Sequence, residues 1–155
     1  MEGGKIKLGI VVCEFNADIT ELMLGRALAH ANFLEAEVTT VFKVPGAFDS
    51  PIAIQNLLEK SDVDGVAVLG AVLEGDTEHD AIVAQHAARK MMDLSLQFKK
   101  PVALGISGPG MTRMQGQERI DEYAKRSVEA AVKLIKRMRK AESGSSSSAK
   151  PFVIQ

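Results

Sequence analysis

The sequence lacks the features that mark secreted, membrane-spanning and nucleic-acid-binding proteins. Cys13 is the only cysteine, which excludes an internal disulfide and fits a reducing compartment. A short apolar run from Ile6 to Cys13 falls far below the roughly 20 residues of a transmembrane helix, and no signal-peptide cleavage pattern follows it. Basic and acidic residues nearly balance, 19 against 20, so no net field attracts nucleic acid or an anionic membrane. We therefore predict a cytoplasmic protein without nucleic-acid or membrane partners.

The 155 residues are enough for one domain with one core. Apolar segments of strand length alternate with segments of helical period. The expected strands are 7–13, 36–42, 65–70 and 102–106, and the expected helices are 18–34, 50–59, 77–98 and a C-terminal helix through 124–138. Strands that are apolar on both faces and separated by helices are typical of a parallel sheet covered on both sides. We predict a three-layer α/β/α domain around a four-stranded parallel sheet.

The C-terminal end differs in composition from the rest. Residues 142–155 contain a glycine and a run of serines, followed by the sequence AKPFVIQ. Serine- and glycine-rich segments are typical of flexible linkers. We therefore place the domain in residues 1–141 and interpret 142–155 as a flexible tail, either appended or engineered.

The strongest signal for chemistry follows the third expected strand. Ligands of open parallel sheets bind beyond the carboxyl ends of the strands, where Gly75, Asp76 and Thr77 form a turn before a helix. Backbone N–H groups of such a helix start can bind phosphate, and the alternative is an ordinary helix start capped by Thr77. His79 lies in the first turn, where the helix dipole disfavours the imidazolium, so it is a candidate for proton transfer or a plain surface histidine. The spacing of Asp76, His79 and Asp80 matches no specific metal site, and we expect no metal.

Two of the few aromatic residues follow strands. Phe15 comes after the first strand and Phe48 after the second, in a chain with only 5% aromatic residues. They indicate an apolar pocket for a flat ring, and the alternative for each is core filling. Asp49 could accept hydrogen bonds from ligand hydroxyls or cap the helix that begins at Ser50.

The fourth strand leads into a segment with three glycines and one proline, Gly105 to Gly110. This segment could bring the backbone close to a ligand or simply form a turn. The dinucleotide-binding fingerprint, the GxxxxGK[ST] phosphate loop and the GxSxG elbow are all absent. Arg113 and Arg119 follow, and either could clamp a phosphate or be an ordinary exposed arginine.

Five stretches occur in an order that resembles the lumazine synthase family, most closely its archaeal members, over roughly Lys5 to Ala141. They are EFN at 14–16, VPGAFDSP at 44–51, GAVLEGDTEHD at 70–80, PVALGISGPGMT at 101–112 and QGQER at 115–119. The resemblance implies a flavodoxin-like subunit that assembles into pentamers, often into a 60-subunit icosahedral shell. It also implies a transferase of riboflavin biosynthesis that condenses 5-amino-6-ribitylaminouracil with 3,4-dihydroxy-2-butanone 4-phosphate, without a cofactor.

The resemblance also implies a role for individual residues. Phe15 would stack on the pyrimidine ring, and Asp76, Thr77 and Arg119 would hold the phosphate. His79 would shuttle protons. The ribityl and pyrimidine pocket would be lined by Ala47, Phe48, Asp49, Ala71, Val72, Leu73 and Leu104.

Three positions depart from the common bacterial pattern. Leu104 stands where an aromatic residue is usual, Asp49 where glutamate is usual, and Glu74 where arginine is frequent. Two rival functions stay open: an archaeal-type riboflavin synthase, and a non-catalytic shell or flavin-binding protein. The GDTEHD and VPGAFDSP segments favour the lumazine synthase reading over the first rival.

Overall fold

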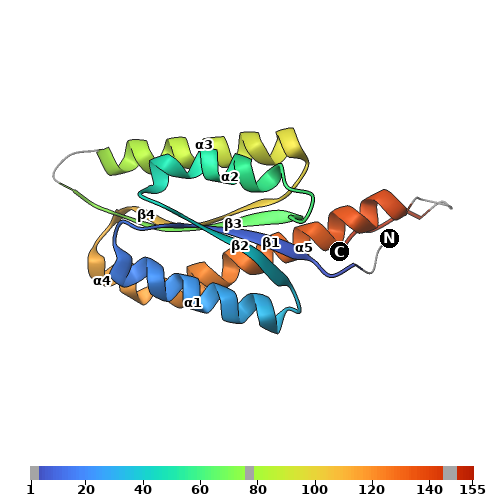
Figure 1. Cartoon of the computed structure of the whole chain (residues 1–155), viewed down its shortest axis with the longest axis horizontal. Coiled ribbons are helices and arrows are strands. Elements are labelled where there is room, and N and C mark those ends of the chain that lie inside the picture. The colour runs from blue at the N-terminus through green and yellow to red at the C-terminus, as the bar shows by residue number, and fades with distance from the viewer. Residues whose placement is uncertain (1–3, 76–78, 145–149) are drawn as a thin grey trace.

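A computed structural model describes residues 4–75, 79–144 and 150–155. Four parallel strands form one sheet in the order β2-β1-β3-β4 (Figure 1). The strands are β1 (Lys7–Cys13), β2 (Glu37–Val44), β3 (Gly65–Leu73) and β4 (Val102–Met111). The helical segments are α1 (Ala17–Phe33), the short 3₁₀ helix η1 (Ala47–Asp49), α2 (Ser50–Leu58), α3 (His79–Phe98), α4 (Arg113–Glu118) and α5 (Ile120–Ser143).

The helices cover both faces of the sheet, as the sequence predicts. Side chains of β1 alternate between the two faces, so Ile10 and Val12 pack with Met23 of α1, and Val11 and Cys13 pack with α2 and α3 on the other side. Figure 1 shows α2 and α3 on one side of the sheet and α1 and α5 on the other. The predicted three-layer α/β/α fold with a four-stranded parallel sheet is therefore confirmed.

The glycine-rich segment after the fourth expected strand is part of that strand. β4 continues to Met111, so the interpretation of Gly105 to Gly110 as a turn is wrong. The backbone of Gly108 has φ of 100°, and a Cβ atom there would collide with the carbonyl oxygen of Val72 on β3. Only glycine accepts both the positive φ and this close approach of two strands.

Helix α4 was not expected from the sequence, although its start carries a recognisable signal. The Thr112 hydroxyl accepts from the Gln115 N–H at 3.2 Å, and the Gln115 side chain accepts from the Thr112 N–H at 3.0 Å. This is the reciprocal capping box that threonine and glutamine form at this spacing. Helix α5 then runs to Ser143, two residues past the predicted domain boundary.

No helix within the described residues has the length and apolar character to cross a membrane. The described part of the chain also contains no group of three or more His, Cys, Asp or Glu side chains arranged to hold a metal ion.

Candidate functional site

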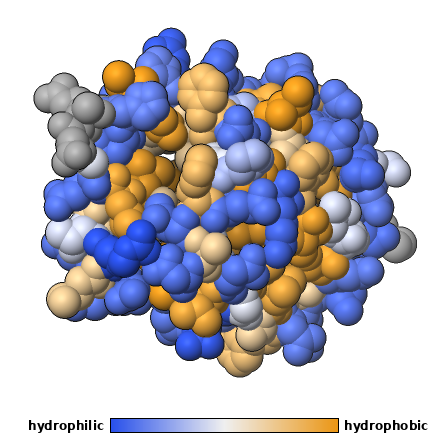
Figure 2. Space-filling view, turned by 60° about the vertical axis from the view of Figure 1, so that its left-hand side comes forward, coloured by the Kyte–Doolittle hydropathy of each residue, from blue (hydrophilic) through white to orange (hydrophobic). Residues whose placement is uncertain are grey.

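A cavity of about 410 Å³ lies at the carboxyl ends of β1 and β3. Figure 2 brings this end of the molecule forward and shows hydrophobic surface set among hydrophilic residues. The walls of the cavity come from the segments that follow β1, β2 and β3 and from the first turns of α3. The lining residues are Cys13, Phe15, Asn16, Gly46, Ala47, Phe48, Asp49, Ala71, Val72, Leu73, Gly75, His79, Asp80 and Val83. The fold thus brings together most of the residues that the sequence singled out.

Phe15 and Phe48 do not fill the core. The exposed fraction of each is 68%, and both line the cavity. The Phe15 N–H donates to the Pro45 carbonyl at 2.9 Å, which fixes the backbone of the β1 exit beside the β2 exit. Two exposed rings at a cavity wall are placed to contact a flat ligand.

Gly46 lies against the ring of Phe15. A Cβ atom on Gly46 would come within 2.7 Å of Phe15 Cδ2 and 2.9 Å of Cε2. The absence of a side chain at position 46 therefore lets the Phe15 ring lie close against the turn that follows β2. Asp49 closes the same turn, because its carboxylate accepts from the Gly46 N–H at 3.0 Å. Asp49 makes no side-chain cap to α2, so that alternative is wrong.

Asn16 is a wall residue that the sequence reasoning missed. Its backbone has φ of 62°, and its amide donates to the Ala71 carbonyl at 2.8 Å, joining the exits of β1 and β3. Its amide oxygen accepts from Arg113 at 3.0 Å, and Arg113 also donates to both carboxylate oxygens of Asp18. The Arg113 hydrogen bonds hold the pKa of Asp18 below its usual range. An asparagine directly after a strand was the available signal, because asparagine tolerates the left-handed conformation.

These hydrogen bonds give Arg113 a positioning role in the wall of the cavity. Its guanidinium is committed to Asp18 and Asn16, while Arg113 is absent from the cavity lining. This pairing favours Arg119, the other arginine that the sequence offered for phosphate.

His79 begins α3 and its side chain lines the cavity. The neighbouring Asp80 accepts a hydrogen bond from the Gly110 N–H at 3.1 Å, which ties the start of α3 to the end of β4. Asp76 and Thr77, predicted to bind phosphate, lie outside the described residues. His79 therefore faces the same space as the two exposed phenylalanines, at the end of the turn where the phosphate was predicted.

Cys13 forms part of the cavity floor but is only 3% exposed. Burial, and secondarily the charge of Asp49, raise the pKa of its thiol to about 12. A thiol with a raised pKa carries almost no thiolate near neutral pH, and the thiolate is the reactive form.

We therefore expect the folded protein to resist thiol reagents. At pH 8, a disulfide exchange reagent such as Ellman's reagent should react with less than about a tenth of the Cys13 thiol in the time that free cysteine needs for completion. After unfolding in guanidinium chloride, one thiol per chain should react at once. Rapid reaction of the native protein would contradict the burial and the raised pKa.

Two predicted site residues do not line this cavity. Leu104 is 57% exposed on β4 and lines a separate groove of about 300 Å³ with Ile106, Tyr123, Arg126 and Ala130. Arg119 lies at the junction of α4 and α5, where its N–H donates to backbone carbonyls of α4. Within a single chain, therefore, neither Leu104 nor Arg119 joins Phe15, Phe48 and His79 in the cavity wall.

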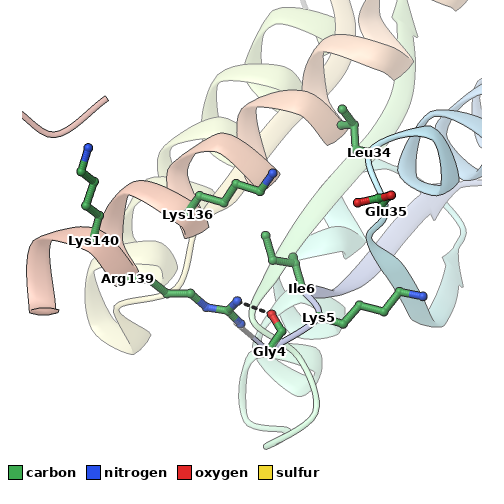
Figure 3. Close-up of a pocket in the computed structure, with 8 residues that line it drawn as sticks. All are labelled: Gly4, Lys5, Ile6, Leu34, Glu35, Lys136, Arg139 and Lys140. Atoms are coloured by element: carbon green, nitrogen blue, oxygen red, sulfur yellow. Dashed lines mark hydrogen bonds between the residues drawn. The ribbon is translucent and has the colours of Figure 1, made fainter. Parts of the chain in front are cut away.

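A larger cavity, about 530 Å³, lies at the opposite end of the sheet. Figure 3 shows it between the C-terminal part of α5 and the Leu34–Glu35 turn, with Lys136 and Ile6 beside it and Arg139 reaching the Gly4 carbonyl. It lies where the strands begin, and none of the predicted site residues line it. Position and chemistry both favour the cavity at the carboxyl ends as the functional site.

Fold and cavity together define the class: a flavodoxin-like three-layer α/β protein with a largely apolar cavity at the carboxyl ends of a parallel sheet. The chain belongs to the 6,7-dimethyl-8-ribityllumazine synthase family, whose model matches residues 5–139. This confirms the family predicted from the sequence.

Several archaeal proteins named 6,7-dimethyl-8-ribityllumazine synthase are similar along most of the chain. The protein of Metallosphaera sedula is 58% identical over 147 residues, covering 95% of this chain and 97% of the relative. That of Archaeoglobus fulgidus is 63% identical over 135 residues, covering 87% and 94%. That of Saccharolobus islandicus strain M.14.25 is 61% identical over 142 residues, covering 92% of both.

Proposed function

We propose that this chain is a lumazine synthase, a transferase of riboflavin biosynthesis. It condenses 5-amino-6-ribitylaminouracil with 3,4-dihydroxy-2-butanone 4-phosphate to 6,7-dimethyl-8-ribityllumazine, with loss of phosphate and water. The observation that carries the proposal is the cavity in which Phe15, Phe48, Asp49 and His79 meet. Family membership over residues 5–139 supports the same reaction.

For this reaction the protein needs only to align the two substrates and to transfer protons. The amino group of the pyrimidine is itself the nucleophile toward the ketone, so no residue needs to form a covalent bond with substrate. Imine formation, elimination of phosphate and ring closure each move a proton between heteroatoms or carbon. His79, on the cavity wall, is the candidate to carry these protons. The reaction needs neither a metal nor an organic cofactor.

The walls fit the two halves of the pyrimidine substrate. The exposed rings of Phe15 and Phe48 would hold the flat pyrimidine, and Ala71, Val72 and Leu73 line the same space. The Asp49 carboxylate could accept hydrogen bonds from ribityl hydroxyls in addition to its bond from Gly46.

Substitution of Gly46 by alanine tests the position of the Phe15 ring. The new methyl group would push the ring off the turn, and we expect the KM for the pyrimidine to rise up to about tenfold, since an aromatic contact contributes about 0.5–1.5 kcal/mol. The melting temperature should change little, because Phe15 is mostly exposed. Gly25→Ala is the matched control, because a Cβ there meets nothing within 4 Å. An unchanged KM in the Gly46 variant would place the pyrimidine elsewhere.

The phosphate would be held by Asp76 and Thr77 through backbone groups and by Arg119. Because Arg119 and Leu104 do not line the cavity of their own chain, we propose that a neighbouring copy supplies both. The exposed groove around Leu104, between β4 and α5, would then complete the cavity of the next subunit. This arrangement requires a homo-oligomer, which we propose to be a pentamer or a 60-subunit shell of pentamers.

The rival activity, riboflavin synthase, uses the lumazine product as its only substrate. Incubation of the purified protein with 6,7-dimethyl-8-ribityllumazine alone distinguishes the two enzymes. We expect the lumazine absorbance to persist and no riboflavin fluorescence to develop. Formation of riboflavin would overturn the proposed function.

We also propose that the enzyme works in the cytoplasm. A single buried cysteine requires no oxidising compartment, and the proposed substrates are phosphorylated and polar metabolites.

A further inference from the structure

Strand β2 lies at the edge of the sheet, and the described residues leave its outer side without a partner strand (Figure 1). Its side chains are poorly covered on both faces: Val41 and Phe42 point to opposite faces and are 37% and 36% exposed. In β1, by contrast, six of the seven residues are buried. A long edge strand rich in β-branched residues is a template for pairing with another strand, and native proteins usually cover it.

The C-terminal tail has the composition of a strand that lacks a partner. Phe152, Val153 and Ile154 are aromatic or β-branched, and all three are more than a third exposed. Pro151 stands at the start of the run, where a strand tolerates proline. Residues 150–155 have no regular secondary structure, and the Phe152 ring lies beside Lys140, 6.0 Å from its Nζ. The tail of a single chain thus folds back on the end of α5 and leaves β2 open.

We infer that the tail of one copy adds to the edge of β2 in a second copy as a fifth strand. A parallel orientation fits the charges. It sets Lys150 beside Glu37, whereas the antiparallel orientation would bring Lys150 next to Lys43. Six tail residues then span Glu37 to Phe42, and Val153 faces Thr40.

The tail that pairs with β2 comes from a second copy and not from the same chain. In the single chain the tail lies against the end of α5, with Phe152 beside Lys140, and the cavity of Figure 3 separates that end from the Leu34–Glu35 turn that leads into β2. Every copy carries one open β2 edge and one tail. In a closed ring of copies, each tail can therefore pair with the β2 edge of the next copy, and no edge is left open. The other sheet edge, β4, borders the Leu104 groove already assigned to substrate. The inference rests on the proposed assembly of like chains, not on the reaction.

Cysteine pairing between different chains tests the exchange directly. Two variants, Thr40→Cys and Val153→Cys, are co-expressed, one with a size tag, and the assembled protein is oxidised. Side chains on adjacent strands lie close enough for a disulfide, so we expect a heterodimer band on a non-reducing gel. The buried Cys13 thiol should not interfere. Lys90→Cys, on α3, is the matched control and should give no such band with Val153→Cys.

Hydrogen exchange gives an independent readout. A chain that ends at Ser143 should exchange the outward-facing amides of β2 at least about tenfold faster than the full chain, with β1 unchanged. Protection in the full chain without a disulfide between chains would place the tail on its own β2 and overturn the inference. Equal exchange in both chains would overturn it as well. Lumazine formation, assayed on the same samples, reports separately on the proposed function.

Discussion

Replacing His79 by alanine should lower kcat about a hundredfold or more, while the KM values for both substrates change only a few-fold. Proton transfer by a positioned side chain typically contributes 10²–10⁴-fold to a rate. The imidazole lies on the cavity wall beside the residues expected to hold the ring, so its loss removes proton transfer and leaves those contacts in place. Steady-state kinetics with saturating amounts of each substrate separate the two effects.

His86→Ala is the matched control for this experiment. His86 lies on the same helix but does not line the cavity; it lines a neighbouring hollow with Phe48 and Ile82, and should keep the wild-type kcat. Melting curves of both variants show whether the helix is intact. A His79→Ala enzyme with unchanged turnover would remove the proposed proton-transfer role.

Replacing Arg119 by alanine should raise the KM for the butanone phosphate about 10- to 100-fold, because hydrogen bonds to charged groups contribute about 1.5–3 kcal/mol. The KM for the pyrimidine should change much less. Arg89→Ala is the matched control, since Arg89 is an exposed arginine of α3 that lines neither the cavity nor the Leu104 groove. Comparable effects of both arginines on the phosphate substrate would argue against a specific clamp.

Mixed assemblies show which chain provides the arginine. If each cavity takes His79 from one copy and Arg119 from the next, random assembly of His79→Ala with Arg119→Ala restores both residues in about a quarter of the cavities. Co-assembled variants should therefore regain about a quarter of wild-type activity at low phosphate-substrate concentration. Assemblies no more active than the separate variants would place both residues in one chain and contradict the shared cavity.

The sequence predicted those parts of the fold that depend on local pattern. β1 was predicted to the residue, because an uninterrupted apolar run has clear ends. The end of β4 was not, because glycine and proline usually break strands. Gly108, in the missed end, is there for a tertiary reason: a Cβ would collide with the carbonyl oxygen of Val72 on β3. No local pattern reveals such a contact.

Only those site residues that follow the strands of the sheet could be predicted from the sequence. Residues after β1, β2 and β3 meet because parallel strands end at one edge, so Phe15, Phe48 and His79 were found together. The links from Arg113 to Asn16 and Asp18 join residues almost a hundred positions apart, and nothing in the local sequence signals them. Leu104 and Arg119 do not line this cavity, and under the proposed function their role would depend on how copies assemble.

The most direct measurement mixes the purified protein with 5-amino-6-ribitylaminouracil and 3,4-dihydroxy-2-butanone 4-phosphate. Lumazine is followed by its absorbance, and inorganic phosphate is assayed in the same samples. We expect product and phosphate to appear together in equal amounts, at a rate proportional to the protein concentration. A folded and assembled protein that forms no lumazine above the uncatalysed rate would contradict the proposed function. The shell or flavin-binding reading would then stand, with Leu104, Asp49 and Glu74 as the first residues to revert to the bacterial pattern.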